Sequence, residues 1–468
     1  MAAASVLVVE YSLYSFLPVQ SGLNLLKYFN IFTYISLSDL YTNYLNIDLF
    51  GYPVGIRAVS QYACLPLILL LAVVCIIIHC RKRPAAGKDL LGWFVYGINH
   101  IVDRFLRRFH LLGMEFHKTL SIQKGVVILL LFLYLLSGLS FTVTIPVTDQ
   151  TDAAARQYTS ELAGAITDDT FRRIDEIQTE LDNTLAAYEQ ALLKYESGEM
   201  EYPQYDVYAR EAEAARIKST GLSVVRQRAE ELRSLGDEKG FAPWLIEESP
   251  YKGTYGNEAR VNQQSAALVA MLTVVLLLAG SFAYETQSGM TYLLASTQRG
   301  RKTLLRRKVG MAAILTTIVW AVTYGLEFHA FLGVCDTGTF TASVQNLSML
   351  ENFPIQCSIA VFLVGLYLFR WLALFTCAML TMLISSFMKR METAYIATCG
   401  VILLPSVLYL YLDLEPLKYL SLALLVEAMP VLIDLSSKGI SIFIVLILLL
   451  ALAILSGCVL RRKTKAAT

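Results

Sequence analysis

Charged side chains are scarce in this sequence. Asp, Glu, Lys and Arg make up 16% of the 468 residues, and hydrophobic residues make up 56%. A typical soluble domain carries about 25% charged residues. Because so little charge is available to cover a water-exposed surface, the sequence argues against a single soluble domain.

Motifs for nucleotide hydrolysis and for metal-dependent catalysis are missing. The phosphate-cradling pattern GxxxxGK[ST] occurs nowhere, so we expect this chain neither to hydrolyse nucleotide nor to bind a cofactor of its own. No serine stands in a GxSxG pattern, and no clustered His, Asp and Glu predict an intramembrane lipid-modifying enzyme. We therefore expect no enzyme activity, no catalytic residue and no metal site. The histidines form neither HxxH nor HExxH pairs: His79, His100, His110, His117 and His329.

Cysteine spacing excludes two further kinds of site. The eight cysteines contain no CxxC pair, which excludes zinc and thioredoxin-like motifs. Most lie in apolar runs, where cysteine serves as a small apolar side chain. Cys335 and Cys357 could both lie outside the membrane, and the sequence leaves open whether they pair. Met1 is followed by neither a charged segment nor an A-x-A cleavage site, so we expect no cleavable signal peptide.

Long apolar runs, by contrast, are abundant. About 20 apolar residues cross a bilayer as one helix. A weaker run at 4–18 is short and contains Glu10. The sequence predicts an all-α polytopic membrane protein with about eight transmembrane helices, of which seven are clear. The seven clear runs are 58–79, 125–145, 266–284, 309–332, 356–387, 393–411 and 439–460.

Basic residues recur at alternate connections between the spans. Segment 81–124 holds nine bases against three acids, and segment 285–308 holds six bases against one acid. Lys389 and Arg390 separate two further spans, and the tail at 461–465 is basic. Basic connections favour the cytoplasmic side of a membrane. We therefore expect both termini in the cytoplasm, and the following segments outside: 19–57, 147–264, 333–355 and 412–438.

Residues 147–264 differ in composition from the rest of the chain. They hold 23 acidic and 13 basic residues, whereas the remainder holds 15 acidic and 26 basic residues. The sequence thus predicts an acidic water-exposed domain carried by a basic membrane part. The acids either cover a solvated helix surface or collect a cationic substrate, and the sequence leaves both interpretations open.

Helical periodicity predicts the form of this domain. Apolar residues at three- and four-residue spacing indicate a helix over 171–193, with Asp168 and Asp169 as cap candidates. After a break at 197–203, we expect a second helix over 205–235, closed by Gly236. The two helices would form an antiparallel hairpin. Prolines, glycines and aromatic residues then predict a compact irregular return, which includes Trp244, Tyr251 and Tyr255.

The first 80 residues echo the last two spans. Leu26-Lys27-Tyr28 precedes a span that ends in a basic stop at 81–83, and Leu417-Lys418-Tyr419 precedes one that ends at 461–463. We expect residues 1–80 to be a membrane segment, either a truncated remnant of a preceding unit or a genuine extra pair of spans. The other expected parts are a basic cytoplasmic segment at 81–124, a transmembrane helix at 125–146, the acidic helical domain at 147–264 and a five-span domain at 265–468.

The connection 285–308 has an ordered pattern of residues. It reads Glu-x-x-x-Gly-x-x-x-Leu-Leu-x-x-Thr-x-x-x-Arg from Glu285 to Arg301. A short amphipathic helix at the membrane face fits this order, because a basic end suits both a helix C-terminus and anionic lipid. A basic cytoplasmic stop signal alone is the simpler alternative.

This pattern resembles the cytoplasmic coupling loop of ABC-2-type transporter permeases, the membrane subunits of ATP-binding cassette transporters. A large outside domain after the first span is similar to the larger bacterial members. The resemblance covers roughly 100–468, and residues 1–99 depart from the six-span family pattern. Segment 104–124 is basic and amphipathic and is similar to the family's interfacial elbow helix, with Arg104, Arg107, Arg108, Glu115 and Lys118.

The resemblance implies a function and partners. The chain would be a multi-pass permease subunit in a bacterial plasma membrane, with ATP bound on a separate ATPase subunit. A second permease copy or paralogue would complete the pathway, and no nucleic acid is implied. Most such permeases export, but the substrate and the direction stay open. The residues implied to face the ATPase are Glu285, Gly289, Leu293, Leu294, Thr297, Arg299 and Arg301.

Charges inside the spans are the remaining candidates, because each costs at least about 2.5 kcal/mol at the bilayer centre. Arg370 lies in mid-span, and Glu327 and His329 lie near the outer end of the run 309–332. They either line a transport pathway, or snorkel and pair for structural reasons. Two other functional classes stay open: a membrane receptor or sensor with a helical ectodomain, and a transporter driven by an ion gradient.

Overall fold

The computed structural model describes residues 46–49, 52–55, 110–139, 143, 149–290, 300–412, 421–437 and 442–466. The chain divides into two compact units, Met1–Gly97 and Ile98–Thr468. In the first unit, the described residues form an antiparallel hairpin of β1 (Asn46–Leu49) and β2 (Tyr52–Gly55). The predicted spans 4–18 and 58–79 lie outside the described residues.

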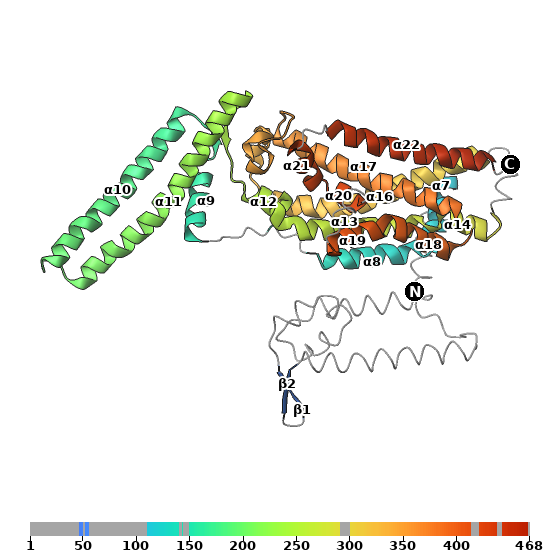
Figure 1. The fold of residues 1–468 in the computed structure, drawn as a ribbon, viewed down its shortest axis with the longest axis horizontal. Helices are drawn as coiled ribbons and strands as arrows, with labels where there is room; N and C mark the ends of the chain where they lie inside the picture. Colours follow the sequence, from blue (N-terminus) through green and yellow to red (C-terminus); the bar gives the residue numbers. More distant parts are fainter. Residues whose placement is uncertain are drawn as a thin grey trace. The chain divides into compact units, whose positions relative to one another are not determined.

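The second unit is mostly helical and contains a bundle of long apolar helices (Figure 1). Among the described residues, four helices are long and apolar enough to cross a membrane: Arg260–Gln287, Thr303–Leu332, Ile359–Phe387 and Met391–Tyr409. They are formed by α13 (Arg260–Leu278) with α14 (Gly280–Gln287), α16 (Gly300–Leu332), α17 (Ile359–Phe387), and α18 (Met391–Thr398) continuing into α19 (Leu404–Leu412). Four of the seven clear apolar runs therefore form helices of membrane-spanning length.

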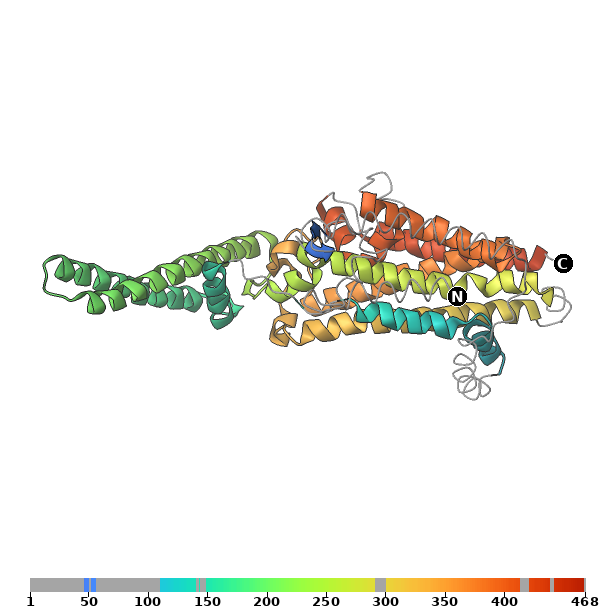
Figure 2. The same cartoon turned by 90° about the horizontal axis from the view of Figure 1, so that it is seen from below.

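The run predicted at 125–145 forms a shorter helix than expected. It is α8 (Gly125–Ser137), and it follows α7 (His110–His117) and a π-helical turn at Lys118–Ile122. The two helical pieces, Leu112–Ile122 and Gly125–Ser137, meet at 68° (Figure 2) and form either one broken span or a re-entrant loop. The bend requires Gly125, because a Cβ there would lie 2.6 Å from the backbone oxygen of Thr119.

The C-terminal part of the bundle contains three further helices. Residues 442–460 of the run at 439–460 lie in α22 (Ile442–Ala466). Segment 412–438, expected outside, contains α20 (Leu422–Glu427) and α21 (Met429–Ser437). Ala428 between them has a positive φ of 68°, which turns the chain sharply. Helix α20 packs against α13 and α17, so part of this connection is buried in the bundle.

The predicted helical hairpin is present and consists of α10 (Asp168–Glu196) and α11 (Tyr202–Lys239), which lie side by side in both views (Figures 1 and 2). A third helix, α9 (Gln150–Glu161), packs on α11 and was not predicted. A two-residue pairing of β3 (Gly164–Ala165) with β4 (Trp244–Leu245) closes the base. Residues 149–245 are called the arm below.

Three local predictions about this region were wrong. The cap of α10 is Thr167, which forms a reciprocal capping box with Thr170, and the two aspartates lie in the first turn. Helix α11 ends at Gly240, in a left-handed conformation, and Gly236 is buried inside the helix. The expected irregular return contains α12 (Ser249–Tyr255).

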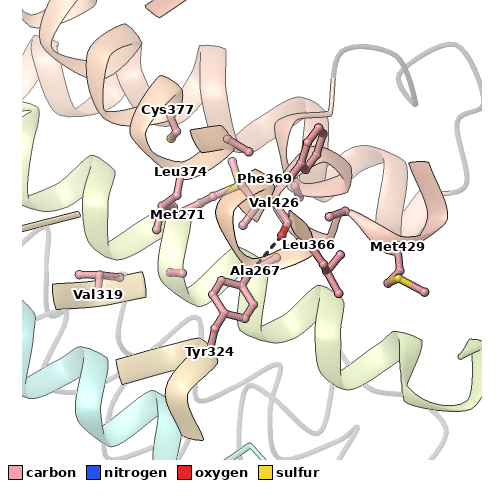
Figure 3. Packing of buried hydrophobic residues seen from close by; sticks show 14 of the residues in the cluster. Ala267, Met271, Val319, Tyr324, Leu366, Phe369, Leu374, Cys377, Val426 and Met429 are labelled. Atoms are coloured by element: carbon pink, nitrogen blue, oxygen red, sulfur yellow. Dashed lines mark hydrogen bonds between the residues drawn. The ribbon is translucent and has the colours of Figure 1, made fainter. Parts of the chain in front are cut away.

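The second unit has two separate hydrophobic cores. The bundle core gathers residues such as Met271, Val319 and Leu374 from α13, α16 and α17 (Figure 3). The arm core is smaller and is built around Ile174, Leu222 and Leu232. Consecutive residues belong to different cores, because Leu245 is in the arm core and Ile246 is in the bundle core.

Candidate functional site: two buried charge clusters

Four charged side chains from three segments meet inside the bundle. Glu115 and Lys118 come from α7 and the following turn, Glu285 from α14 and Lys308 from α16. Lys118 is bonded to Glu285 and lies 2.8 Å from Glu115. The Lys308 ammonium lies 2.8 Å from Glu285 and 3.7 Å from Glu115. We call these four residues the lysine–glutamate cluster.

This cluster is buried and electrically balanced. Lys308 is fully buried, and the other three side chains are at most 9% exposed. Lys308 also donates to the Ser281 carbonyl at 2.5 Å and lies 4.4 Å from the centre of the Phe282 ring. Because two positive charges face two negative charges, every buried charge has a partner, as a low-dielectric interior requires. The cluster thereby ties α7, α14 and α16 together.

The cluster unites two sets of residues that the sequence analysis kept apart. Glu115 and Lys118 were assigned to an elbow helix, and Glu285 to a loop that faces a partner. Glu285 is only 5% exposed, and its expected role toward an ATPase stays a prediction. Lys308 was missing from the predicted site. Its position directly before the apolar run 309–332 was the signal that this lysine needs a partner.

Gly289 is exposed just beyond Glu285 and has a φ of 71°, which terminates α14 in a left-handed turn. Arg301 lies in the first turn of α16, but its side chain is outside the description. The remaining predicted coupling and elbow residues lie outside the described residues: Leu293, Leu294, Thr297, Arg299, Arg104, Arg107 and Arg108.

A second buried cluster surrounds Arg370. Its guanidinium lies 2.6 Å from Glu327, and its Nε donates to the Glu427 carbonyl at 3.1 Å. Three tyrosine rings enclose it, with centroids between 4.6 and 6.0 Å away: Tyr255, Tyr324 and Tyr367. Tyr324 also donates to the Val426 carbonyl, which fixes α20 beside α16 (Figure 3). Arg370 is fully buried and Glu327 is 8% exposed.

The second cluster includes two of the three predicted intramembrane residues. Arg370 and Glu327 form an ion pair, whereas His329 is exposed on α16 and lies outside the cluster. Arg370 Nη2 and Glu427 Oε2 are buried without a hydrogen-bond partner among the described residues. This geometry suits a structural tie between α16, α17 and α20, and a role in a transport pathway stays a prediction.

A polar network at the base of the arm joins it to the connection between α16 and α17. Arg228 on α11 lies 3.0 Å from Glu248 and donates to the Asn346 carbonyl at 3.2 Å. Asn346 also accepts from the Trp244 backbone amide at 2.8 Å, and Glu248 accepts from the Ser348 backbone amide at 3.0 Å. The network was not predicted, because Asn346 and Ser348 lie 100 to 118 residues away in sequence from their partners on the arm side.

Helix α12, which follows the base of the arm, forms two further hydrogen bonds, and the second of them reaches the Arg370 cluster. Tyr251 is bonded to Thr339 at 2.8 Å, and Tyr255 is bonded to Tyr367 at 2.9 Å. Tyr367 donates to Glu327 at 3.2 Å. Burial alone would raise the pKa of the Glu248 carboxyl. Its contacts outweigh burial and hold this pKa below its usual value; they are Lys252, Ser348 and Arg228. The arm is therefore anchored by an ionised carboxylate.

The chain matches no protein-family model, no curated protein and no solved structure. Within the described parts of the chain, no group of three or more His, Cys, Asp or Glu side chains is placed to hold a metal ion. Cys335 and Cys357 are free thiols. The long apolar helices define a membrane-embedded helical protein.

Proposed function

We propose that the chain is the transmembrane permease subunit of an ABC-2-type transporter, an exporter powered by a separate ATPase subunit. The lysine–glutamate cluster is the observation that carries this proposal. It joins the helix before the first span of the second unit to both ends of the connection 285–308. A force applied to that connection by an ATPase would reach α7, α14 and α16 together.

Two further features support the proposal. The 68° bend between α7 and α8 would suit a helix that lies at a membrane face before its chain turns into the bilayer. The chain also contains no phosphate-cradling motif, so energy from ATP would have to come from a partner.

Co-purification with an ATPase subunit tests the proposal. The tagged chain is extracted from its native membranes in mild detergent, and soluble subunits that accompany it are assayed for ATP hydrolysis. We expect an ATPase with the wild-type chain and its loss with Leu293→Asp combined with Leu294→Asp. If no ATPase accompanies the wild-type chain even after crosslinking, the proposal is wrong.

The alternative functions make different predictions in the same preparation. A receptor or sensor would be isolated without an ATPase but with a ligand or signalling partner. A transporter driven by an ion gradient would move substrate in ATP-free vesicles when a gradient is imposed. No observation on the described residues favours either alternative as strongly as the lysine–glutamate cluster favours coupling to a partner.

A further inference from the structure

The far end of the arm carries a cluster of tyrosines where α10 turns into α11. The rings of Tyr195 and Tyr205 stack with centroids 4.6 Å apart, and Tyr202 lies 6.2 Å from Tyr195. Tyr188 and Tyr205 are joined through their hydroxyls at 3.1 Å. We call these four tyrosines and the turn between them the tyrosine tip. The stacking holds the end of the hairpin in one conformation.

Several large apolar side chains at the tyrosine tip are exposed to solvent. Leu193 is 66% exposed, Tyr202 is 61% exposed, and Val207 is more than half exposed. Amides of Glu199 and Met200 bond to the Lys194 carbonyl, so the turn that presents these side chains is itself ordered. Exposed aromatic and aliphatic side chains on a preordered surface are typical of a binding site.

The tip is predominantly acidic, although the Arg216 guanidinium lies 5.8 Å from the centroid of the Tyr188 ring. Residues 188–208 contain five acids and one base. Elsewhere on the arm, several acids pair with arginines, as Asp175 does with Arg226 and Asp168 with Arg233. Within the described residues, only Asp206 of the five acids at the tip forms an ion pair. The four others are Glu189, Glu196, Glu199 and Glu201.

We infer that the tyrosine tip binds a cationic peptide that carries apolar side chains. Unpaired carboxylates would attract its lysines or arginines, and the exposed tyrosine faces would accept both its apolar side chains and its cations. A neutral glycan would use the rings but leave the carboxylates unused. This inference names a substrate class for the proposed permease. Binding of the peptide does not depend on the proposed function, whereas transport of the bound peptide rests on it.

Peptide binding to the full chain tests the inference without ATP or an ATPase. The chain is placed in nanodiscs of uncharged phosphatidylcholine, and a fluorescent peptide of alternating lysine and tryptophan is titrated by anisotropy. Empty nanodiscs correct for lipid binding. We expect saturable binding that weakens with added salt, because salt screens exposed charges. The same peptide with glutamate in place of lysine is expected not to bind.

Matched variants locate the site. We expect at least tenfold weaker binding for Leu193→Ser with Tyr202→Ser, and likewise for Glu196→Gln, Glu199→Gln and Glu201→Gln combined. Controls lower on the arm are Val224→Ser, and Glu211→Gln with Glu213→Gln, which are expected to bind within twofold of wild type.

The inference is overturned if wild type does not bind the lysine peptide, or if the tip variants bind as wild type does. Preference for a neutral N-acetylglucosamine oligomer over the lysine peptide would also overturn it. Because no ATPase is present, none of these outcomes bears on the co-purification test, and the two proposals can fail separately.

Discussion

At the residue scale, the stability of the lysine–glutamate cluster depends on whether a substitution removes a positive charge, a negative charge or one of each. Two lysines and two glutamates are buried together, and each contributes to a neutral total. Removing one member leaves an uncompensated charge in the interior, whereas removing one of each sign leaves a neutral pair. The cluster therefore predicts that a double change is milder than a single one.

Glu285→Gln should lower the stability of the second unit by roughly 3–5 kcal/mol, because Lys118 and Lys308 would then share Glu115 alone. Adding Lys308→Met should recover part of the loss, since Lys118 keeps its partner Glu115 at 2.8 Å. Thermal unfolding in detergent measures both. The exposed Glu392→Gln is the control, expected to change little. A double variant no more stable than Glu285→Gln would contradict this account.

At the element scale, the arm depends on a close approach of α9 to α11. Gly221 on α11 faces α9, where an added Cβ would lie 2.8 Å from both the Ala154 Cβ and the Ala155 backbone nitrogen. A backbone atom cannot move aside as a flexible side chain can, so the helices would have to separate. The contact therefore sets the position of α9.

Gly221→Ala should destabilise the arm by about 1–3 kcal/mol, the usual cost of overpacking a core. Circular dichroism follows the loss of helix on heating. Thr220→Ala, at the exposed neighbouring position, is the matched control and should leave the transition nearly unchanged. If Gly221→Ala is as stable as wild type, the close packing of α9 on α11 is wrong.

The elements that the sequence predicted best are those with a long periodic pattern. The stripe in 171–193 extends over several turns, and α10 is present there. Helix α9 escaped prediction because its buried residues are few, Ala154 and Tyr158 among them, which is too short a stripe to recognise. The end of α11 was misplaced because Gly236 and Gly240 both fit a helix end. Only packing against Phe241 and Pro243 shows that Gly236 is a contact residue.

At the scale of the whole molecule, the basic connections and the acidic arm are expected on opposite sides of the membrane. Lys and Arg concentrate in the connections that the positive-inside pattern assigns to the cytoplasm. The arm and the connection between α16 and α17 bond to each other at the base of the arm, so they share one side. The end of α14 should then lie on the other side.

Cysteine labelling of intact cells tests this arrangement. Glu199→Cys at the exposed turn of the arm should react with a membrane-impermeant maleimide added outside. Ser288→Cys, exposed beyond α14, should react only after the cells are opened. The wild-type chain measures the background from its own cysteines. If Ser288→Cys is labelled in intact cells, the expected orientation is wrong.

The sequence predicted the members of the candidate site better than their arrangement. Glu115, Lys118 and Glu285 were each singled out, but their convergence depends on contacts between segments 167 residues apart. Arg370 and Glu327 were singled out because charges within spans need partners, but their pairing with each other was not predicted. The tyrosine rings around Arg370 come from α12, α16 and α17, and no local pattern relates them.

The boundary between Leu245 and Ile246 has a consequence for how this protein can diversify. The arm core and the bundle core are separate clusters on either side of that peptide bond, and Trp244 and the polar network at the base are the contacts that join them. Whole helical turns could be gained or lost in α10 and α11, each changing the reach of the arm by about 5.4 Å. Such changes would alter the reach of the arm while the residues of the bundle core stay the same.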